Sequence, residues 1–191
     1  MIDKKIFAKL RKEMEERDIL REKLIVNSRP ILKESKQVIY ALHRNDIVSA
    51  KKSLDSARMA LIDLKKIAED SSLEVGAFYS ALQEYTEAAC YYYFVKEDRL
   101  ADNNELLVDG ENYLLGLCDL TGELARRAVF SVVNENYHEI KKIQEFVETI
   151  HNEFLEFELR NGEIRRKSDS IKYNLKKIED IMYDLKIRGK L

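Results

Sequence analysis

The stretch Tyr113–Val133, which reads YLLGLCDLTGELARRAVFSVV, decides the fold of this chain. Only four of its side chains are charged: Asp119, Glu123, Arg126 and Arg127. The other positions are mostly apolar, and they recur at the three- and four-residue spacing of an α-helix around nearly its whole circumference. Such a helix has to be enclosed by other elements, and we expect those to be helices as well. The stretch therefore predicts an all-α fold with a largely buried central helix.

A second stretch, Ser71–Val95, has the same character. It contains no basic residue, and its only charged side chains are Glu74, Glu84 and Glu87. Glu84 and Glu87 are separated by about one helical turn, as are Asp119 and Glu123 in the first stretch, so each pair shares one helix face. If the two helices pack together, the four carboxylates can meet in a partly buried place. Carboxylates there need a compensating cation, either an arginine or a metal ion.

The composition supports one helical domain that covers residues 1–191. The chain has one proline and six glycines, which disfavours a strand-rich fold, and 45% of its residues are hydrophobic, which is enough for a core. We expect an up-and-down bundle of about six to seven long helices. Several of these would be longer than a globule of this size needs, which leaves surface for contacts between subunits.

The apolar spacing and the capping residues set the expected boundaries. The apolar spacing of the first segment is interrupted at its only proline, and we expect one long helix there, for which a straight or a kinked course stays open. The expected segments are a helix from Asp3 to about Arg44 containing Pro30, a helix from the Asn45-Asp46 cap to Lys66, a helix capped by Ser71 or Ser72 and ending near Val95, a loop over Glu97–Asn112, a helix over Tyr113–Val133, a helix from Asn136 to about Leu159 closed by Asn161-Gly162, and a helix from Glu163 to about Ile187.

The charge and the cysteines exclude several classes of protein. The net charge is −2, so a nucleic-acid partner would have to be held by local basic patches. Cys90 and Cys118 lie in apolar helical patterns without a CxxC spacing, which favours buried thiols in a reducing compartment. No apolar run reaches the length of a membrane helix, and the first residues lack the apolar centre of a signal peptide. We expect a cytoplasmic protein without a membrane partner.

The acidic residues suggest a metal site built from oxygen ligands. Carboxylates without histidine or cysteine suit Mg²⁺ or Mn²⁺, which in phosphoryl chemistry activate a water molecule and neutralise the phosphate. Paired glutamates on helices more often face solvent or form ion pairs, and this alternative stays open on spacing alone. A ferritin-type iron site is disfavoured because the sequence has no Glu-x-x-His, and His43, His138 and His151 are expected to be surface or hydrogen-bonded residues.

The same segments resemble a known family. Leu82–Ala88, LQEYTEA, resembles the LQEYxEA helix of Trax proteins, and Tyr113–Leu124, YLLGLCDLTGEL, resembles their YLLGxxDLTGEL segment. Weaker similarity to the translin/Trax family extends over nearly the whole chain. It is carried by Arg21–Leu24, Glu34–Lys36 and Leu42–Arg44 near the start, and by Tyr183–Gly189 at the end.

The resemblance implies a translin-like fold and a metal-dependent endoribonuclease that cleaves single-stranded RNA. In that family translin subunits bind RNA and single-stranded DNA without the acidic set, whereas Trax subunits carry it and cleave RNA with Mg²⁺. It implies that Glu84, Glu87 and Asp119 are metal ligands or catalytic carboxylates, and that Glu123 is a fourth ligand or an acid that orients the others. The chain departs from the family in a shorter loop over residues 97–112 and in Phe130, where a smaller or polar residue is usual. A self-assembled homo-oligomer, with an octamer as the first expectation, follows by the same resemblance.

Contacts with RNA are expected from basic and aromatic side chains. Most of the basic pairs simply solvate helix faces, but Arg126-Arg127 follows the acidic pair by one turn and could hold a phosphate or balance the carboxylates. The run Tyr91–Phe94 could stack on bases, although packing is the commoner role of consecutive aromatic residues in a helix. Two other functions stay open: a non-catalytic oligomer that binds RNA or single-stranded DNA, and a purely structural helical oligomer.

Overall fold

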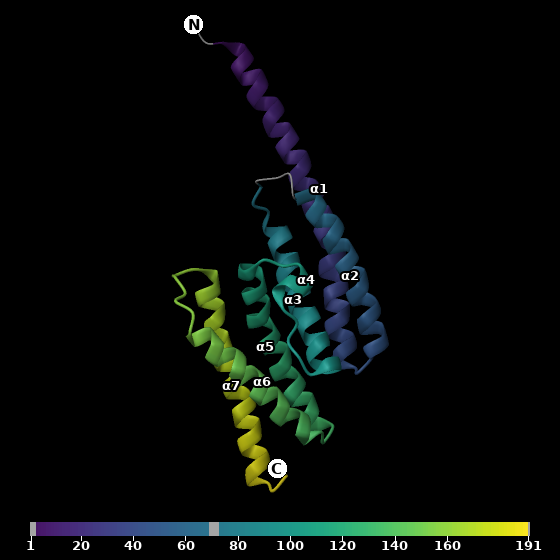
Figure 1. Cartoon of the computed structure of the whole chain (residues 1–191), viewed down its shortest axis with the longest axis vertical. Coiled ribbons are helices and arrows are strands. Elements are labelled where there is room, and N and C mark those ends of the chain that lie inside the picture. The colour runs from purple at the N-terminus through teal and green to yellow at the C-terminus, as the bar shows by residue number, and fades with distance from the viewer. Residues whose placement is uncertain (1–2, 69–72, 191) are drawn as a thin grey trace.

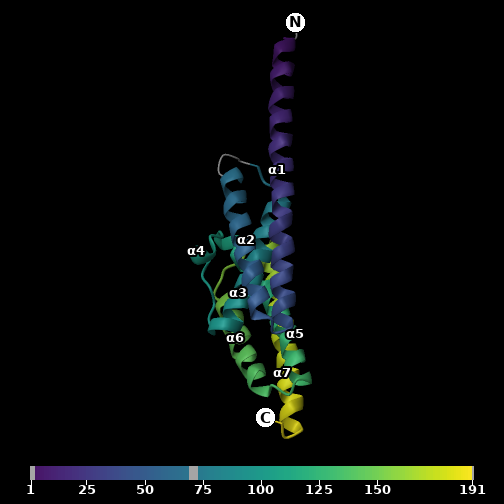
Figure 2. The same ribbon diagram turned by 90° about the vertical axis from the view of Figure 1, so that its right-hand side faces the viewer.

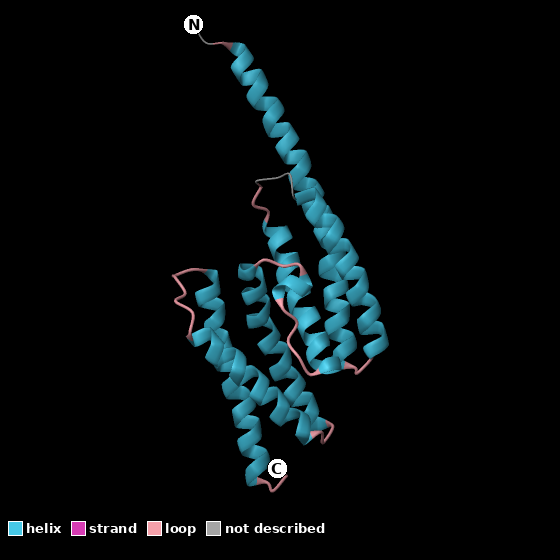
Figure 3. Ribbon diagram, in the orientation of Figure 1, coloured by secondary structure: helices cyan, strands magenta, loops and turns pink. Residues whose placement is uncertain are grey.

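The computed structural model describes residues 3–68 and 73–190, and within these ranges all regular secondary structure is helical, with loops between the helices and no strand (Figures 1 and 3). This confirms the all-α class. The helices are α1 (Lys4–His43), α2 (Ile47–Ala68), α3 (Gly76–Glu97), α4 (Asn103–Leu106), α5 (Gly110–Val133), α6 (Tyr137–Leu155) and α7 (Glu163–Ile187). None of them, over the part of the chain that is described, has the length and apolarity of a membrane-spanning helix.

Helix α1 is much longer than the others. Asp3 caps it by accepting a hydrogen bond from the backbone N–H of Lys5 (2.9 Å), and the helix continues through Pro30 as the single long helix that was predicted. Pro30 lies on an exposed position, so the helix loses one backbone hydrogen bond without disturbing a neighbour. The second half of α1 packs against α2 and α3, whereas the first half extends beyond the other helices (Figure 2).

Capping groups explain why two helix starts differ from the sequence prediction. Asp109 accepts a hydrogen bond from the backbone N–H of Asn112 (3.0 Å), which starts α5 at Gly110 and not at Tyr113. Asp102 caps the short helix α4 inside the segment that was predicted to be a loop. Helix α3 begins at Gly76, and the predicted capping serines 71 and 72 lie outside the described residues.

The other boundaries agree with the prediction, with one exception. Asp46 accepts a hydrogen bond from the backbone N–H of Ser49 (3.0 Å), as expected for the cap of α2. Helix α6 ends at Leu155, four residues before the predicted end, and Gly162 precedes α7 as its N-cap instead of closing α6.

The helices are arranged side by side, so that α3 and α5 occupy the middle (Figure 1). Helix α3 packs against α1 on one side and α5 on the other, and α5 in turn packs against α6 and α7. The aromatic run of α3 belongs to this core: Tyr91, Tyr92 and Phe94 are buried, and Tyr93 is half-buried with the guanidinium of Arg99 4.2 Å from its ring centre. Packing is therefore the role of these aromatic residues.

One glycine sets the distance between the two central helices. A Cβ atom added to Gly116 of α5 would lie 2.6 Å from Cβ of Thr86 and 2.7 Å from the backbone oxygen of Gln83, both on α3. Real Cβ atoms do not come this close to other atoms. The backbones of α3 and α5 therefore meet closely at Gly116, within one turn of an acidic residue on each helix.

We expect Gly116→Ala to lower the free energy of unfolding by about 1–3 kcal/mol, the usual cost of overpacking a close contact. Gly122→Ala in the same helix is the matched control, because its new Cβ would find its nearest neighbour at 3.7 Å, an ordinary contact. That control should be neutral, or more stable by up to about 1 kcal/mol, since alanine favours helix more than glycine does. Urea denaturation followed by circular dichroism measures both. Equal stability of the two variants would contradict the close approach.

Candidate acidic active site

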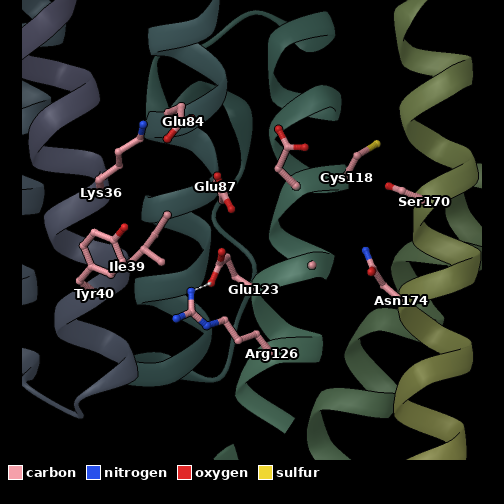
Figure 4. Close-up of a pocket in the computed structure, with 12 residues that line it drawn as sticks. Lys36, Ile39, Tyr40, Glu84, Glu87, Cys118, Glu123, Arg126, Ser170 and Asn174 are labelled. Atoms are coloured by element: carbon pink, nitrogen blue, oxygen red, sulfur yellow. Dashed lines mark ion pairs between the residues drawn. The ribbon is translucent and has the colours of Figure 1, made fainter. Parts of the chain in front are cut away.

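The four predicted carboxylates line one pocket of about 520 Å³ between the central helices. Helix α3 supplies Glu84 and Glu87, and α5 supplies Asp119 and Glu123. Figure 4 shows Glu87 and Glu123 directed into the space between α3 and α5. Helical spacing puts each acidic pair on one face of its helix, and the close contact at Gly116 brings the two helices together. The two pairs therefore line the same pocket.

Helices α1 and α7 complete the walls of this pocket. Helix α1 contributes Lys36, Ile39 and Tyr40, and α7 contributes Ser170 and Asn174. The ammonium group of Lys36 points toward Glu84 in Figure 4. None of these residues was predicted as a site residue. Lys36 lies in one of the segments that carry the family resemblance, but nothing local in the sequence distinguishes Ser170 or Asn174 from other polar residues of an exposed helix.

The two glutamates of α3 have no charged partner in contact. Over residues 3–68 and 73–190, neither Glu84 nor Glu87 takes part in a side-chain hydrogen bond or an ion pair. Glu87 is 8% exposed, and burial, reinforced by the neighbouring charge of Asp119, raises its pKa to about 9. Burial also raises the pKa of Glu84, while Lys36 opposes that shift. Without a metal ion, Glu87 therefore holds a proton at neutral pH.

Asp119 is paired with a lysine of α7. The Nζ atom of Lys167 lies 2.6 Å from Oδ2 of Asp119 and 3.3 Å from Oε1 of Gln83. The ammonium group therefore bridges a carboxylate of α5 and an amide oxygen of α3. In sequence Lys167 follows Arg165 and Arg166, and nothing in this basic run connects it with the acids.

Glu123 is held by a histidine of α1. The Nε2 atom of His43 and Oε2 of Glu123 lie 2.5 Å apart, and Oη of Tyr91 lies 3.3 Å from Nδ1 of His43. A carboxylate only accepts, so Nε2 carries the proton, and in the neutral ring Nδ1 accepts from the tyrosine hydroxyl. The hydrogen bond from His43 holds the pKa of Glu123 below its usual value despite partial burial. The prediction that His43 is hydrogen-bonded is thus correct.

The donor set fits a divalent ion, although the carboxylates are not gathered into a closed cage. For the described part of the chain, no group of three or more His, Cys, Asp or Glu side chains is close enough to hold one metal ion. Two of the four acids are engaged by Lys167 and His43, and the other two are free. The free pair is partly desolvated, which is unfavourable for its charged form, and a hard cation would remove this penalty. Glu84, Glu87, Asp119 and Glu123 are the residues that could hold Mg²⁺ or Mn²⁺.

The two arginines that follow the acids have different surroundings. Arg126 is half exposed, lines the acidic pocket and lies 3.8 Å from Oε2 of Glu123. Arg127 is buried, and its guanidinium donates to Oε1 of Glu139 (2.7 Å), to the backbone oxygen of Leu42 (3.0 Å) and to Oδ1 of Asn45 (3.0 Å). These contacts tie α5 to α6 and to the end of α1. The buried Arg127 therefore has a structural role that the sequence prediction did not include, and of the two arginines it is Arg126 that lines the acidic pocket.

The buried proton on Glu87 predicts a pH dependence of stability in EDTA. The folded protein keeps this proton up to about pH 9, whereas the unfolded chain releases it near the ordinary pKa of 4.5. Because the folded state binds more protons in this window, its stability falls as the pH rises, with a limit of roughly 1.4 kcal/mol per pH unit. Glu87→Gln should lose this pH-dependent fall in stability, so the variant should unfold at a higher temperature than the wild type at pH 8.

Thermal unfolding between pH 5 and pH 9 measures this difference. Glu148→Gln is the control, because Glu148 is exposed on α6 and its substitution should leave the pH profile unchanged. If the unfolding temperatures of Glu87→Gln and the wild type differ by the same amount at every pH in this range, the pKa of Glu87 is not raised in the folded protein.

Comparison with known proteins places this arrangement in a family. The model of the Translin family matches residues 19–189. Translin of Gallus gallus is 42% identical over 82 residues, which are 43% of this chain and only 36% of that protein, about a third of its length. Translin-associated protein X of Pongo abelii is 28% identical, with 96% of this chain and 78% of that protein aligned.

A solved structure shares the fold. The structure of AfC3PO in complex with duplex RNA superposes with a TM-score of 0.87 over 95% of this chain and 97% of that chain, at 22% identity. The family match covers most of the chain, including both acidic helices. This chain belongs to the Translin family.

Proposed function

We propose that this protein is a Trax-like, metal-dependent endoribonuclease that cleaves single-stranded RNA. The observation that carries the proposal is the one pocket that all four carboxylates of α3 and α5 line. Two of these carboxylates have no charged partner among the residues that the structure describes. A solvated helix face would not enclose a glutamate to the extent seen for Glu87. The family to which the chain belongs supports the same assignment by resemblance.

The residues of the pocket divide into two chemical groups. Glu84, Glu87, Asp119 and Glu123 would hold Mg²⁺ or Mn²⁺, which supplies an activated water molecule and Lewis-acid polarisation of the phosphate when bound. Lys36 and Arg126 line the same pocket and provide positive charge for the phosphate backbone of a substrate. The hydrogen bond from His43 keeps Glu123 ionised and fixes its position.

Arg126 and Phe130 give a place for RNA beside the acids. The guanidinium carbon of Arg126 lies 5.7 Å from the ring centre of Phe130, and Phe130 is 41% exposed. An exposed ring next to a cation suits the stacking of a base whose phosphate lies over the pocket. We propose that these two residues contact RNA and that Arg127 does not.

We further propose that the chain forms a homo-oligomer in the cytoplasm, and an octamer is the oligomer that we expect first. The part of α1 that extends beyond the other helices exposes an apolar stripe at helical spacing, formed by Ile6, Phe7, Leu10 and Met14. Four large apolar side chains on one helix face are unusual for a surface that stays in water. A subunit contact would bury them.

A non-catalytic protein that binds RNA or single-stranded DNA is the second candidate. The engagement of Asp119 by Lys167 and of Glu123 by His43 favours it, because protein groups already neutralise half of the acidic set. Such a protein would bind nucleic acid with a steep dependence on salt and without turnover.

A cleavage assay with purified protein separates these functions. We expect cleavage of labelled single-stranded RNA in Mg²⁺ or Mn²⁺, and none in EDTA. A duplex substrate is included because the fold neighbour AfC3PO is described in complex with duplex RNA. Salt-sensitive binding without cleavage in any metal would favour the second candidate. The absence of both binding and cleavage would leave a structural oligomer.

A further inference from the structure

Lys167 contacts Asp119, one of the carboxylates of the acidic pocket, from a helix other than the two that supply these carboxylates. It lies near the start of α7, whose residues Ser170 and Asn174, one and two turns further on, line the same pocket. Its ammonium group is 2.6 Å from Oδ2 of Asp119 and 3.3 Å from Oε1 of Gln83, and its side chain is 28% exposed. The lysine is therefore anchored at both α5 and α3, and it is still partly in contact with solvent.

Among the described residues, Lys167 is the cation that neutralises Asp119. No other ion pair of Asp119 is present in these ranges, and Arg126 lies against Glu123 instead. An ammonium group and a divalent ion bound to the same small carboxylate would repel each other strongly, because the pocket is partly shielded from water. The two cations therefore compete for Asp119.

We propose that Lys167 is a built-in counter-ion of the metal site: it occupies Asp119 in the metal-free protein and has to move away when a divalent ion binds. This inference rests on the proposed metal site. Its consequence is that Lys167 weakens metal binding and thereby sets the metal concentration at which the site fills. Linkage makes the effect reciprocal, so bound metal must weaken the contact between Lys167 and Asp119 by the same factor.

Titration of the full-length protein with Mn²⁺, followed by electron paramagnetic resonance of the free ion, tests this inference without an activity measurement. We expect Lys167→Met to bind Mn²⁺ about 10- to 100-fold more tightly than the wild type, within the usual range of coupling between two sites. Lys172→Met is the matched control, because Lys172 is an exposed lysine of the same helix, and its affinity for Mn²⁺ should be unchanged. Asp119→Asn should lose Mn²⁺ binding.

The outcomes separate the inference from the proposed function. Unchanged or weaker Mn²⁺ binding by Lys167→Met, in a wild type that binds Mn²⁺ through Asp119, would overturn the role of Lys167 and leave the metal site intact. If the wild type and Lys167→Met both fail to bind Mn²⁺, the metal site is wrong and the inference falls with it. A merely structural lysine would lower the unfolding temperature without tightening Mn²⁺ binding, so thermal unfolding in EDTA is measured on the same samples.

Discussion

The double variant Glu84→Gln with Asp119→Asn should cleave single-stranded RNA at least about 10³-fold more slowly than the wild type, while its helix content and assembly stay the same. Each substitution removes one negative oxygen ligand and keeps the size of the side chain. Loss of one group that stabilises a transition state costs about 10²–10³ in rate, and groups that act on one site do not contribute additively. Single-turnover cleavage in saturating Mg²⁺ measures the rate constant.

The other end of the same two helices provides the control for this variant. Glu74 lies just before α3 and Glu111 lies in the first turn of α5, and both line a separate pocket. Glu74→Gln with Glu111→Gln removes the same amount of charge from the same region of the fold. It should cleave like the wild type. If the two double variants lose activity to the same extent, general electrostatics explains the effect and the site assignment is wrong.

The second large effect concerns stability. Arg127→Met should lower the free energy of unfolding by about 3–5 kcal/mol, because it removes one partner of a buried ion pair and leaves the other uncompensated. Within the described ranges, the carboxylate of Glu139 would keep Ser131 (2.7 Å) and Asn136 (3.2 Å) as its hydrogen-bond donors. The backbone oxygen of Leu42, at the end of α1, would lose the guanidinium as well. Urea denaturation measures the change.

The neighbouring arginine is the control. Arg126 is half exposed, so Arg126→Met should change the stability by no more than about 0.5 kcal/mol. Its effect should appear in RNA binding, as a weaker affinity with a smaller dependence on salt. Similar stability of the Arg126→Met and Arg127→Met variants would contradict the structural role given to Arg127.

Most of the fold could be predicted from sequence because the helices are long and their apolar residues are regularly spaced. The errors lie at the ends of helices, where the hydrogen bonds of one or two side chains determine at which residue the helix begins or ends. Asp109 is such a case, since its hydrogen bond to Asn112 starts α5 earlier than the apolar pattern does. At Pro30 the prediction of one long helix is confirmed, because an exposed proline costs that helix one hydrogen bond and creates no clash with a neighbouring helix.

The acidic half of the site could also be predicted, because each pair lies within a helix that is otherwise almost free of charge. The basic residues around the carboxylates could not be predicted. They come from α1 and α7, and their local sequence resembles any solvated helix face. His43 is 80 residues away from Glu123 in sequence and Lys167 is 48 residues away from Asp119, while Lys36 lines the same pocket. Arg127 shows the same limit: it is adjacent to Arg126 in sequence, but the neighbours that bury it lie on other helices.

The metal site itself is tested most directly by diffraction from crystals soaked in Mn²⁺, with data collected for anomalous scattering. We predict an anomalous peak in the pocket between α3 and α5, within roughly 2–2.5 Å of carboxylate oxygens from both helices, Glu87 and Asp119 among them. Such a peak would also require Lys167 to have moved from its contact with Asp119. A pocket without a peak, in crystals of protein that cleaves RNA in the same Mn²⁺ buffer, would contradict the assignment of these four acids as the catalytic metal site.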